Sequence, residues 1–159
     1  MAAADLVQGT RLLALEGVGN PDNVGGLFRT AFAFGVEAVV LNPSTADPLY
    51  RKAIRTSMAA TLRVPFVRIS PWSDSLDPLR AAGFQIVALT PDPEAVDLEE
   101  YARHAAERLV LLVGSEGPGL DETSLRDADA RVRIPIDPRA DSLNVVVAAG
   151  IALNRLFIR

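Results

Sequence analysis

The chain contains no cysteine and only one histidine, His104, among its 159 residues. Without cysteine there is no disulfide framework, no thiolate metal site and no cysteine nucleophile. One histidine cannot build a multi-histidine metal cage. The sequence therefore excludes zinc chemistry, and we expect a functional site without a metal.

Lysine is almost absent. Lys52 is the only one beside 15 arginines, and the formal net charge is −4. A negative total argues against a protein that coats nucleic acid by bulk electrostatics. Any contact with RNA must then be a local patch, and the basic residues do crowd into one stretch. That stretch contains Arg51, Lys52, Arg55, Arg63 and Arg68.

Long hydrophobic runs are also missing. The longest apolar run, Val145 to Leu153, is too short for a bilayer, which needs roughly 20 residues. The first five residues lack the basic and apolar regions of a secretory signal. With 49% apolar residues the chain can bury a proper core. We expect one domain over residues 1–159, cytoplasmic, without membrane contact and without an added RNA-recruiting domain.

Short runs rich in Val, Leu and Ile alternate with helical patterns along the chain. This alternation predicts an α/β domain with a mostly parallel sheet flanked by helices. Each predicted strand is bounded by Gly, Pro or Asn. The strands are expected at Arg11–Glu16, Val36–Leu41, Leu62–Ile69, Gln85–Thr90, Arg108–Val113 and Arg131–Ile134.

The first predicted helix covers Val24–Phe34, with Asn23 as its N-cap and Gly35 as the left-handed residue that ends it. The last, Ser142–Phe157, is apolar on every side, so we expect it to be buried all round, against the sheet or a second subunit. Further helices are expected within Pro48–Ala59, Ser75–Ala82 and Asp97–Ala106.

Three polar segments interrupt this apolar chain: Asn20–Arg29, Gly114–Leu120 and Ile134–Asn144. The glycines of the second segment let a backbone approach a ligand closely. In the third, capping of the last helix fully explains Ser142. Capping does not explain Asn144, whose amide must find partners in a ligand or in the turn that carries Glu116.

Two familiar nucleotide-binding signatures fail. Gly17-Val18-Gly19 follows the first strand as a dinucleotide fingerprint would, but Asp22 stands where the third glycine belongs. At the end of the second predicted strand stands Asn42, where a dinucleotide-binding site would have an acidic residue that binds the ribose hydroxyl groups. The turn after Val113 lacks the Gly-Lys-Ser/Thr ending of a phosphate-binding loop. A nucleotide-dependent oxidoreductase is thus a poor alternative.

The three segments, in this order and spacing, resemble the three motifs of the SpoU, or TrmH-like, RNA ribose methyltransferases of the SPOUT superfamily. Asn20–Arg29 is similar to the first motif, Gly114–Gly117 to the second, and Ile134-Pro135 with Ser142–Asn144 to the third. The resemblance covers nearly the whole chain. It implies a C-terminal trefoil knot, a rare exception to the rule against knotted chains, and a homodimer with each active site near the subunit interface.

The resemblance also implies the chemistry: transfer of a methyl group from S-adenosylmethionine to a ribose 2'-hydroxyl of structured RNA, either rRNA or tRNA. The methyl donor is expected against the knot loops. The residues expected to bind it are Leu89, Thr90, Gly114, Ile134, Ser142 and Leu143.

The resemblance gives Arg29 the central catalytic role. We expect it to grip the phosphate beside the target ribose and to stabilise the forming oxyanion. The other expected catalytic residues are Asn23, Glu116, Ser142 and Asn144. The alternative is a SPOUT-fold RNA-binding or assembly protein that has lost catalysis. The residues expected to contact RNA are Arg29, Arg51, Lys52, Arg55 and Arg63.

Overall fold

The computed structural model describes residues 3–74 and 76–158. Within them the chain forms one seven-stranded sheet of order β3-β2-β1-β6-β4-β7-β5, and every neighbouring pair of strands is parallel. The strands are β1 (Arg11–Glu16), β2 (Ala38–Leu41), β3 (Phe66–Arg68), β4 (Gln85–Leu89), β5 (Val96–Asp97), β6 (Leu109–Gly114) and β7 (Ala130–Arg133).

The predicted α/β class and the mostly parallel sheet are confirmed. Strand β1 has the predicted bounds, and the other five predicted strands exist with shifted ends. The largest shift is in β3, because a 3-10 helix (η2, Ala60–Leu62) occupies the start of the predicted strand. The two-residue strand β5 was not predicted, because so short a segment has no readable alternation.

Six α-helices and two 3-10 helices lie in the described part of the chain. The first 3-10 helix, η1 (Ala3–Gln8), comes before β1. Helix α5 (Glu122–Asp127), between β6 and β7, was not predicted, and neither was η1. The start of the helix predicted at Ser75 lies outside the described residues. The helices are η1 (Ala3–Gln8), α1 (Pro21–Ala33), α2 (Arg51–Thr56), α3 (Asp77–Ala81), α4 (Leu98–Ala102), α5 (Glu122–Asp127) and α6 (Val145–Phe157).

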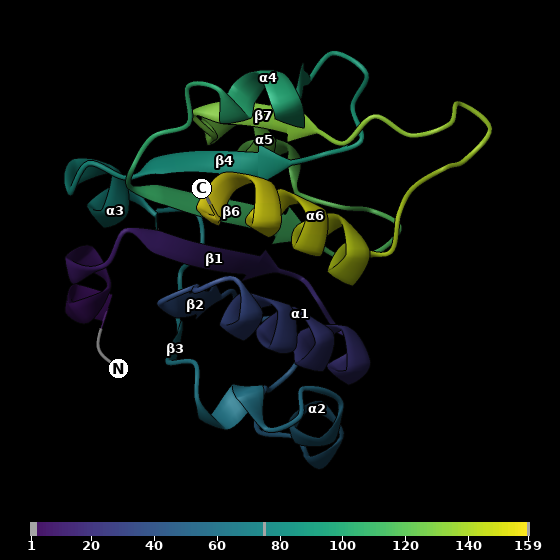
Figure 1. Cartoon of the computed structure of the whole chain (residues 1–159). Coiled ribbons are helices and arrows are strands. Elements are labelled where there is room, and N and C mark those ends of the chain that lie inside the picture. Colours follow the sequence, from purple (N-terminus) through teal and green to yellow (C-terminus); the bar gives the residue numbers. More distant parts are fainter. Residues whose placement is uncertain (1–2, 75, 159) are drawn as a thin grey trace.

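The sheet is the middle layer of three (Figure 1). In β1, Leu13 and Leu15 pack into a core with α1, α4 and α6, whereas Leu12 and Ala14 face a second core with η1, α3 and α5. Successive strand residues point to opposite faces, so a strand covered on both faces is apolar throughout. This explains why β1 and β6 are nearly continuous hydrophobic runs.

The cap of α1 differs from the prediction. The helix begins at Pro21, and its N-cap is Asn20, whose Oδ1 accepts a hydrogen bond of 2.9 Å from the backbone N–H of Asp22. Proline suits the first helical position because its missing N–H has no partner there in any case. Asn23 is therefore inside the first turn instead of capping it. Gly35 has φ +73°, as predicted for the residue that ends the helix.

The cap of α6 is also different. The helix begins at Val145 with Asn144 as its N-cap, so Ser142 does not cap it. The helix is not buried all round within this chain. Val147 is 50% exposed and Ile151 is 43% exposed, whereas Ala149 on the sheet side is fully buried. One face of α6 is therefore apolar and uncovered.

Helices α1 and α6 approach each other at glycines. A Cβ added to Gly26 of α1 would lie 2.9 Å from a methyl group of Val146. On the α2 side, a Cβ on Gly25 would lie 2.8 Å from the carbonyl oxygen of Ala53. The close approach at Gly26 brings the N-terminal half of α1 against the first turn of α6, where two of the polar segments lie.

Candidate active site

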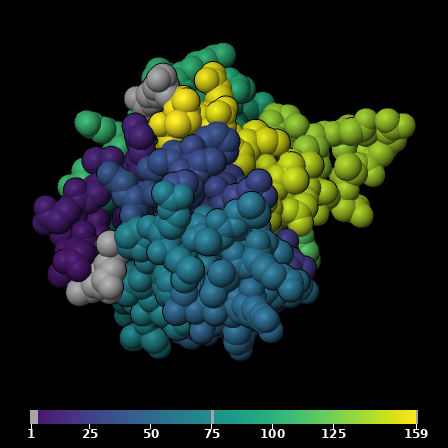
Figure 2. Space-filling view, turned by 60° about the horizontal axis from the view of Figure 1, so that its bottom comes forward, coloured from purple at the N-terminus to yellow at the C-terminus, as the bar shows by residue number. Residues whose placement is uncertain are grey.

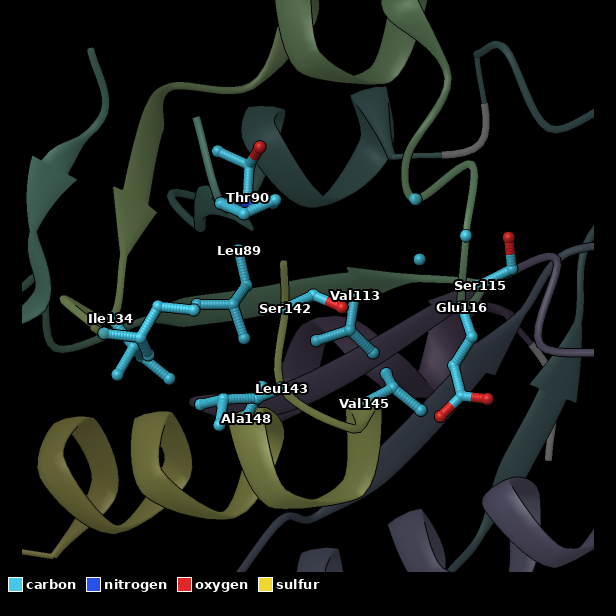
Figure 3. A pocket seen from close by; sticks show the side chains of 15 residues that line it. Leu89, Thr90, Val113, Ser115, Glu116, Ile134, Ser142, Leu143, Val145 and Ala148 are labelled. Carbon is cyan, nitrogen blue, oxygen red and sulfur yellow. The ribbon is translucent and has the colours of Figure 1, made fainter. Parts of the chain in front are cut away.

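A pocket lies where β4, β6 and β7 end, at the carboxyl edge of the sheet, which is the usual ligand-binding edge of open α/β sheets. Its empty volume is about 710 Å³, including space open to solvent. Loops after three strands and the start of α6 form its walls (Figure 3). It is lined by Leu89, Thr90, Pro91, Val113, Gly114, Ser115, Glu116, Gly117, Gly119, Ile134, Ile136, Ser142, Leu143, Val145 and Ala148.

The turn after β6 forms one wall of this pocket. Its chain folds back on itself, so that the Gly119 N–H donates a 3.0 Å hydrogen bond to the Ser115 carbonyl. A Cβ on Gly114 would lie 2.5 Å from the backbone carbon of Gly119, so no other residue fits there without moving the backbone. The segment that the sequence identified as glycine-rich is thus a tight turn whose backbone faces the pocket.

Asn144 joins the three polar segments. Its Oδ1 accepts hydrogen bonds from the N–H groups of Val146 (2.9 Å) and Val147 (3.4 Å), which completes the α6 cap. Its Nδ2 donates to Oε1 of Glu116 at 2.5 Å and to Oδ1 of Asn23 at 3.3 Å. The expectation that the Glu116 turn supplies partners for this amide is confirmed. The side chain of Asn144 is exposed, however, rather than buried.

The charge of the pocket limits what it can bind. Glu116 is the only charged residue in the lining, and most of the other side chains are apolar. Figure 3 shows its carboxylate beside Val145. A phosphate-bearing cofactor would meet no cation here. A nucleoside that carries a positive sulfonium fits both the apolar walls and the acidic group.

All six residues expected to bind the methyl donor line this one pocket, although they come from four separate parts of the sequence. Of the expected catalytic residues, Glu116 and Ser142 also line it, and Asn23 and Asn144 join it through the hydrogen bonds to Glu116. The structure therefore brings nearly all of the predicted site together.

Arg29 is the exception. It follows Asn23 by six residues on α1, which corresponds to about 9 Å along the helix axis. Its side chain is exposed and does not line the pocket. Among the described residues its side chain forms no hydrogen bond or ion pair, so its guanidinium is free to bind an anion.

The predicted basic stretch divides into two groups. Arg51, Lys52 and Arg55 are exposed on α2, and Lys52 forms an ion pair of 3.1 Å with Asp22, next to Asn23. Arg68 instead donates hydrogen bonds to backbone carbonyls of the loop after β2, at 2.8 Å to Asn42, 2.8 Å to Thr45 and 3.3 Å to Pro43. It is therefore structural.

Arg63 extends the exposed basic surface beyond α2. Its guanidinium lies 4.4 Å from the ring centre of Phe32, which is 46% exposed. In Figure 2 the surface of residues 50–70 lies in front, next to that of α1. We call Arg29, Arg51, Lys52, Arg55 and Arg63 the basic surface.

The sequence reasoning missed Glu16, a carboxylate only 4% exposed at the end of β1. Its only signal was an acidic residue that directly follows four apolar residues of the strand. Several pocket residues were also missed individually, because apolar side chains such as Val113, Ile136 and Ala148 look like ordinary core.

Over residues 3–74 and 76–158, no three acidic or histidine side chains come together as a metal site. No helix in that same part of the chain is long and apolar enough to cross a membrane.

The structure is thus an open, parallel α/β sheet with a largely apolar pocket at its carboxyl edge, lined in part by glycine backbone. The sequence model of the SpoU rRNA Methylase family matches residues 10–154, and the chain belongs to this family.

Relatives of this chain include an uncharacterized tRNA/rRNA methyltransferase of Mycobacterium tuberculosis, 46% identical over 95% of this chain and 53% of that protein. The 23S rRNA (guanosine(2553)-2'-O)-methyltransferase RlmP of Bacillus subtilis is 33% identical over 98% of this chain and 61% of its own length. Among solved structures, the AdoMet-bound rRNA methyltransferase from Sinorhizobium meliloti superposes with a TM-score of 0.85 at 35% identity. That match covers 95% of this chain and 59% of the other. The chain thus spans somewhat more than half the length of these relatives.

Proposed function

We propose that this chain transfers a methyl group from S-adenosylmethionine to a ribose 2'-hydroxyl of rRNA or tRNA. The observation that carries the proposal is the Asn144 amide, which joins Asn23 of the first motif to Glu116 of the second beside an apolar, acidic pocket. Membership of the family and the methyltransferases among the relatives support the same activity. Acting on RNA, the protein would work in the cytoplasm.

The pocket residues would hold the methyl donor. Leu89, Ile134 and Leu143 offer apolar contact, and Thr90, Gly114 and Ser142 offer polar groups of backbone and side chain. When bound, S-adenosylmethionine would supply a methyl carbon that its sulfonium makes electrophilic, and the neutral thioether S-adenosylhomocysteine would leave as the ribose oxygen attacks that carbon in line. No metal is needed, because the role of the protein is to align the ribose oxygen with that carbon and to lower the cost of its developing charge.

We assign Arg29 to the substrate rather than to the donor. A guanidinium stays protonated at neutral pH, so it is a poor general base but a good partner for a phosphate and for a forming oxyanion. Proton removal then falls to that phosphate or to water. We expect Arg29→Ala to abolish turnover and to leave the Kd for S-adenosylmethionine nearly unchanged. Loss of donor binding in this variant would refute the assignment.

The basic surface is the proposed contact with RNA. Its cations are exposed, and Lys52 lies next to the catalytic segment through its ion pair with Asp22. Charge reversal at Arg51 and Arg55 should weaken RNA binding and reduce its salt dependence, because each cation that contacts a phosphate releases counterions. An unchanged affinity in a filter-binding titration would remove this surface from the proposal.

We further propose that the protein acts as a homodimer whose second copy covers the exposed face of α6. Support comes from a groove between α1 and α6, lined in part by Val146, Val147 and Ile151. Because Arg29 does not line the pocket of its own chain, we propose that it serves the pocket of the second copy.

Mixing two inactive variants tests this arrangement. An equimolar mixture of Arg29→Ala and Glu116→Ala chains, refolded together, should recover about a quarter of wild-type activity, because half of the dimers are mixed and each has one intact site. A mixture without activity, although both chains form dimers, would show that Arg29 serves its own chain.

The resemblance also leads us to propose that the segment before α6 is threaded as a trefoil knot. Support comes from three loops that meet at one pocket: the turn after β6, the end of β4, and the segment that contains Ser142 and Leu143. Tracing residues 113–145 in an experimental map tests it, and a segment that passes outside the other loops would contradict it.

The decisive assay for the function is transfer of radiolabelled methyl to unmodified rRNA and tRNA transcripts, followed by alkaline hydrolysis. A 2'-O-methyl group blocks cleavage at its linkage, so we expect label in alkali-resistant dinucleotides from one of the two RNAs. Binding of RNA and donor without any transfer would favour the inactive RNA-binding protein. The intact set of Arg29, Glu116 and Asn144 speaks against that alternative.

A further inference from the structure

Glu16 is a buried carboxylate that the proposed reaction does not use. It ends β1, beside Gly114 of β6 in the parallel register, and it is 4% exposed. A buried carboxylate is costly unless hydrogen bonds satisfy it, so its contacts indicate what it does.

Three donors surround this carboxylate. The backbone N–H of Asp121 donates to Oε1 at 2.7 Å, and the indole N–H of Trp72 donates to Oε2 at 2.5 Å. The Ser124 hydroxyl also donates to Oε2. Asp121 is the N-cap of α5 and Ser124 lies within α5, whereas Trp72 lies in the loop after β3. One side chain therefore fastens two segments to the end of β1.

The contact with Asp121 is next to the pocket. The chain turns back after Gly114 and crosses directly over that glycine, where Gly119 and the nitrogen of Leu120 leave no room for a Cβ. Asp121 follows at once, so its bond to Glu16 holds the returning end of the turn, while Ser115, Glu116 and Gly117 in the same turn line the pocket.

We propose that Glu16 is a positioning residue that sets the shape of the pocket turn from the opposite face of the sheet, and thereby sets the affinity for the methyl donor. This inference rests on the proposal that the pocket binds S-adenosylmethionine.

The chemistry of the contacts makes the carboxylate hard to replace. An indole N–H and a backbone N–H can only donate, and each meets a different oxygen of Glu16. In Glu16→Gln one of these oxygens becomes an NH₂ group. This group then faces the N–H of either Trp72 or Asp121, and because both groups are donors, no hydrogen bond forms there. The substitution keeps the size of the side chain and removes one acceptor.

The test compares Glu16→Gln with Glu37→Gln. Glu37 also accepts two backbone N–H bonds, from Thr10 at 2.5 Å and from Arg11 at 2.8 Å, but at the start of β1, away from the pocket. Glu37 is exposed where Glu16 is buried, and its substitution is the control for the loss of a carboxylate that accepts backbone N–H bonds at the other end of β1. Both variants are titrated with S-adenosylmethionine by calorimetry, and amide hydrogen exchange is followed in residues 115–121.

We expect Glu16→Gln to raise the Kd for the donor about tenfold, which corresponds to one lost hydrogen bond to a charged group. Exchange across residues 115–121 should accelerate. At saturating donor and RNA, kcat should stay within about threefold of wild type, because the reacting groups are untouched. Glu37→Gln should change neither the Kd nor the exchange of this turn.

If Glu16→Gln does not fold, Ser124→Ala removes one donor and keeps the bond to Asp121. It should speed exchange at Asp121 and raise the Kd by a smaller factor. An unchanged Kd and unchanged exchange in the folded variant overturn the inference, as does an equal effect of Glu37→Gln. If the wild-type chain does not bind S-adenosylmethionine at all, the proposed function fails first.

Discussion

Substitutions of Asn144 separate its two roles, because one atom caps α6 and another holds Glu116. Asn144→Ala removes both. Loss of an N-cap costs about 1 kcal/mol, and loss of the exposed bond to Glu116 adds at most about 1 kcal/mol. Asn144→Asp keeps an acceptor for the N–H of Val146, so the cap remains, but it places a second carboxylate where the amide lay 2.5 Å from Oε1 of Glu116.

The two variants should therefore rank in one order for the free energy of unfolding and in the opposite order for the affinity for S-adenosylmethionine. In urea unfolding, Asn144→Ala should lower the free energy of unfolding by about 1.5–2 kcal/mol and Asn144→Asp by less, because only the second keeps the cap. In calorimetric titration with S-adenosylmethionine, Asn144→Asp should bind more weakly than Asn144→Ala, because repulsion moves Glu116 and its turn.

A double variant provides the control. In Asn144→Asp with Glu116→Gln, the glutamine amide donates to the new carboxylate, so the link is restored with its direction reversed. Donor binding should recover relative to Asn144→Asp alone, and a double-mutant cycle measures the coupling. If stability and donor affinity fall in the same order across the variants, the link to Glu116 does not shape the pocket.

The remaining predictions concern the backbone and an ion pair. Ala59 has φ +64°, so Ala59→Gly should raise the free energy of unfolding by about 0.5–1 kcal/mol, whereas Ala33→Gly at the end of α1 should lower it by about 1 kcal/mol, both measured in urea. Gly114→Ala should lower it by about 2 kcal/mol or more in the same assay, because the added Cβ meets backbone, and a neutral result would show that the turn can move. The hydrogen bond from Arg155 lowers the pKa of Glu99 below its ordinary 4.5. The small contribution of this ion pair to stability is therefore complete above pH 4.5 and is lost as the pH falls through the lowered pKa of Glu99. Arg155→Gln should accordingly reduce the fall of the melting temperature with decreasing pH over this acidic range, as measured in thermal melts.

The position of the site could be predicted because it follows from strand direction. Gly114 ends an apolar run and Ile134 ends a predicted strand, and parallel strands end at the same edge of a sheet. Once the fold class was read from the alternation of strands and helices, the meeting of these segments was a geometric consequence. The motifs then indicated which of the meeting residues we propose as the site.

The choice of helix caps could not be predicted in the same way. Asn20 and Asn23 both suit an N-cap, as do Ser142 and Asn144, and each pair lies within three residues. Contacts distant in sequence decide between them: Asn23 is drawn inward to accept from Asn144, and Asn144 is held by Glu116. The role of Glu16 could not be predicted for the same reason, because the residues that donate hydrogen bonds to it lie 56 to 108 positions away in the sequence.

The apolar residues of α6 are more numerous than the burial within one copy of the chain explains. An apolar pattern on every side predicts complete burial, and the chain supplies it only on the side of Ala149 and Leu153. Val147 and Ile151 stay exposed beside the groove against α1. A hydrophobic pattern reports the burial of a residue in its working assembly rather than in a single chain. The mismatch at these two residues is therefore an argument for the proposed second copy, independent of the family resemblance.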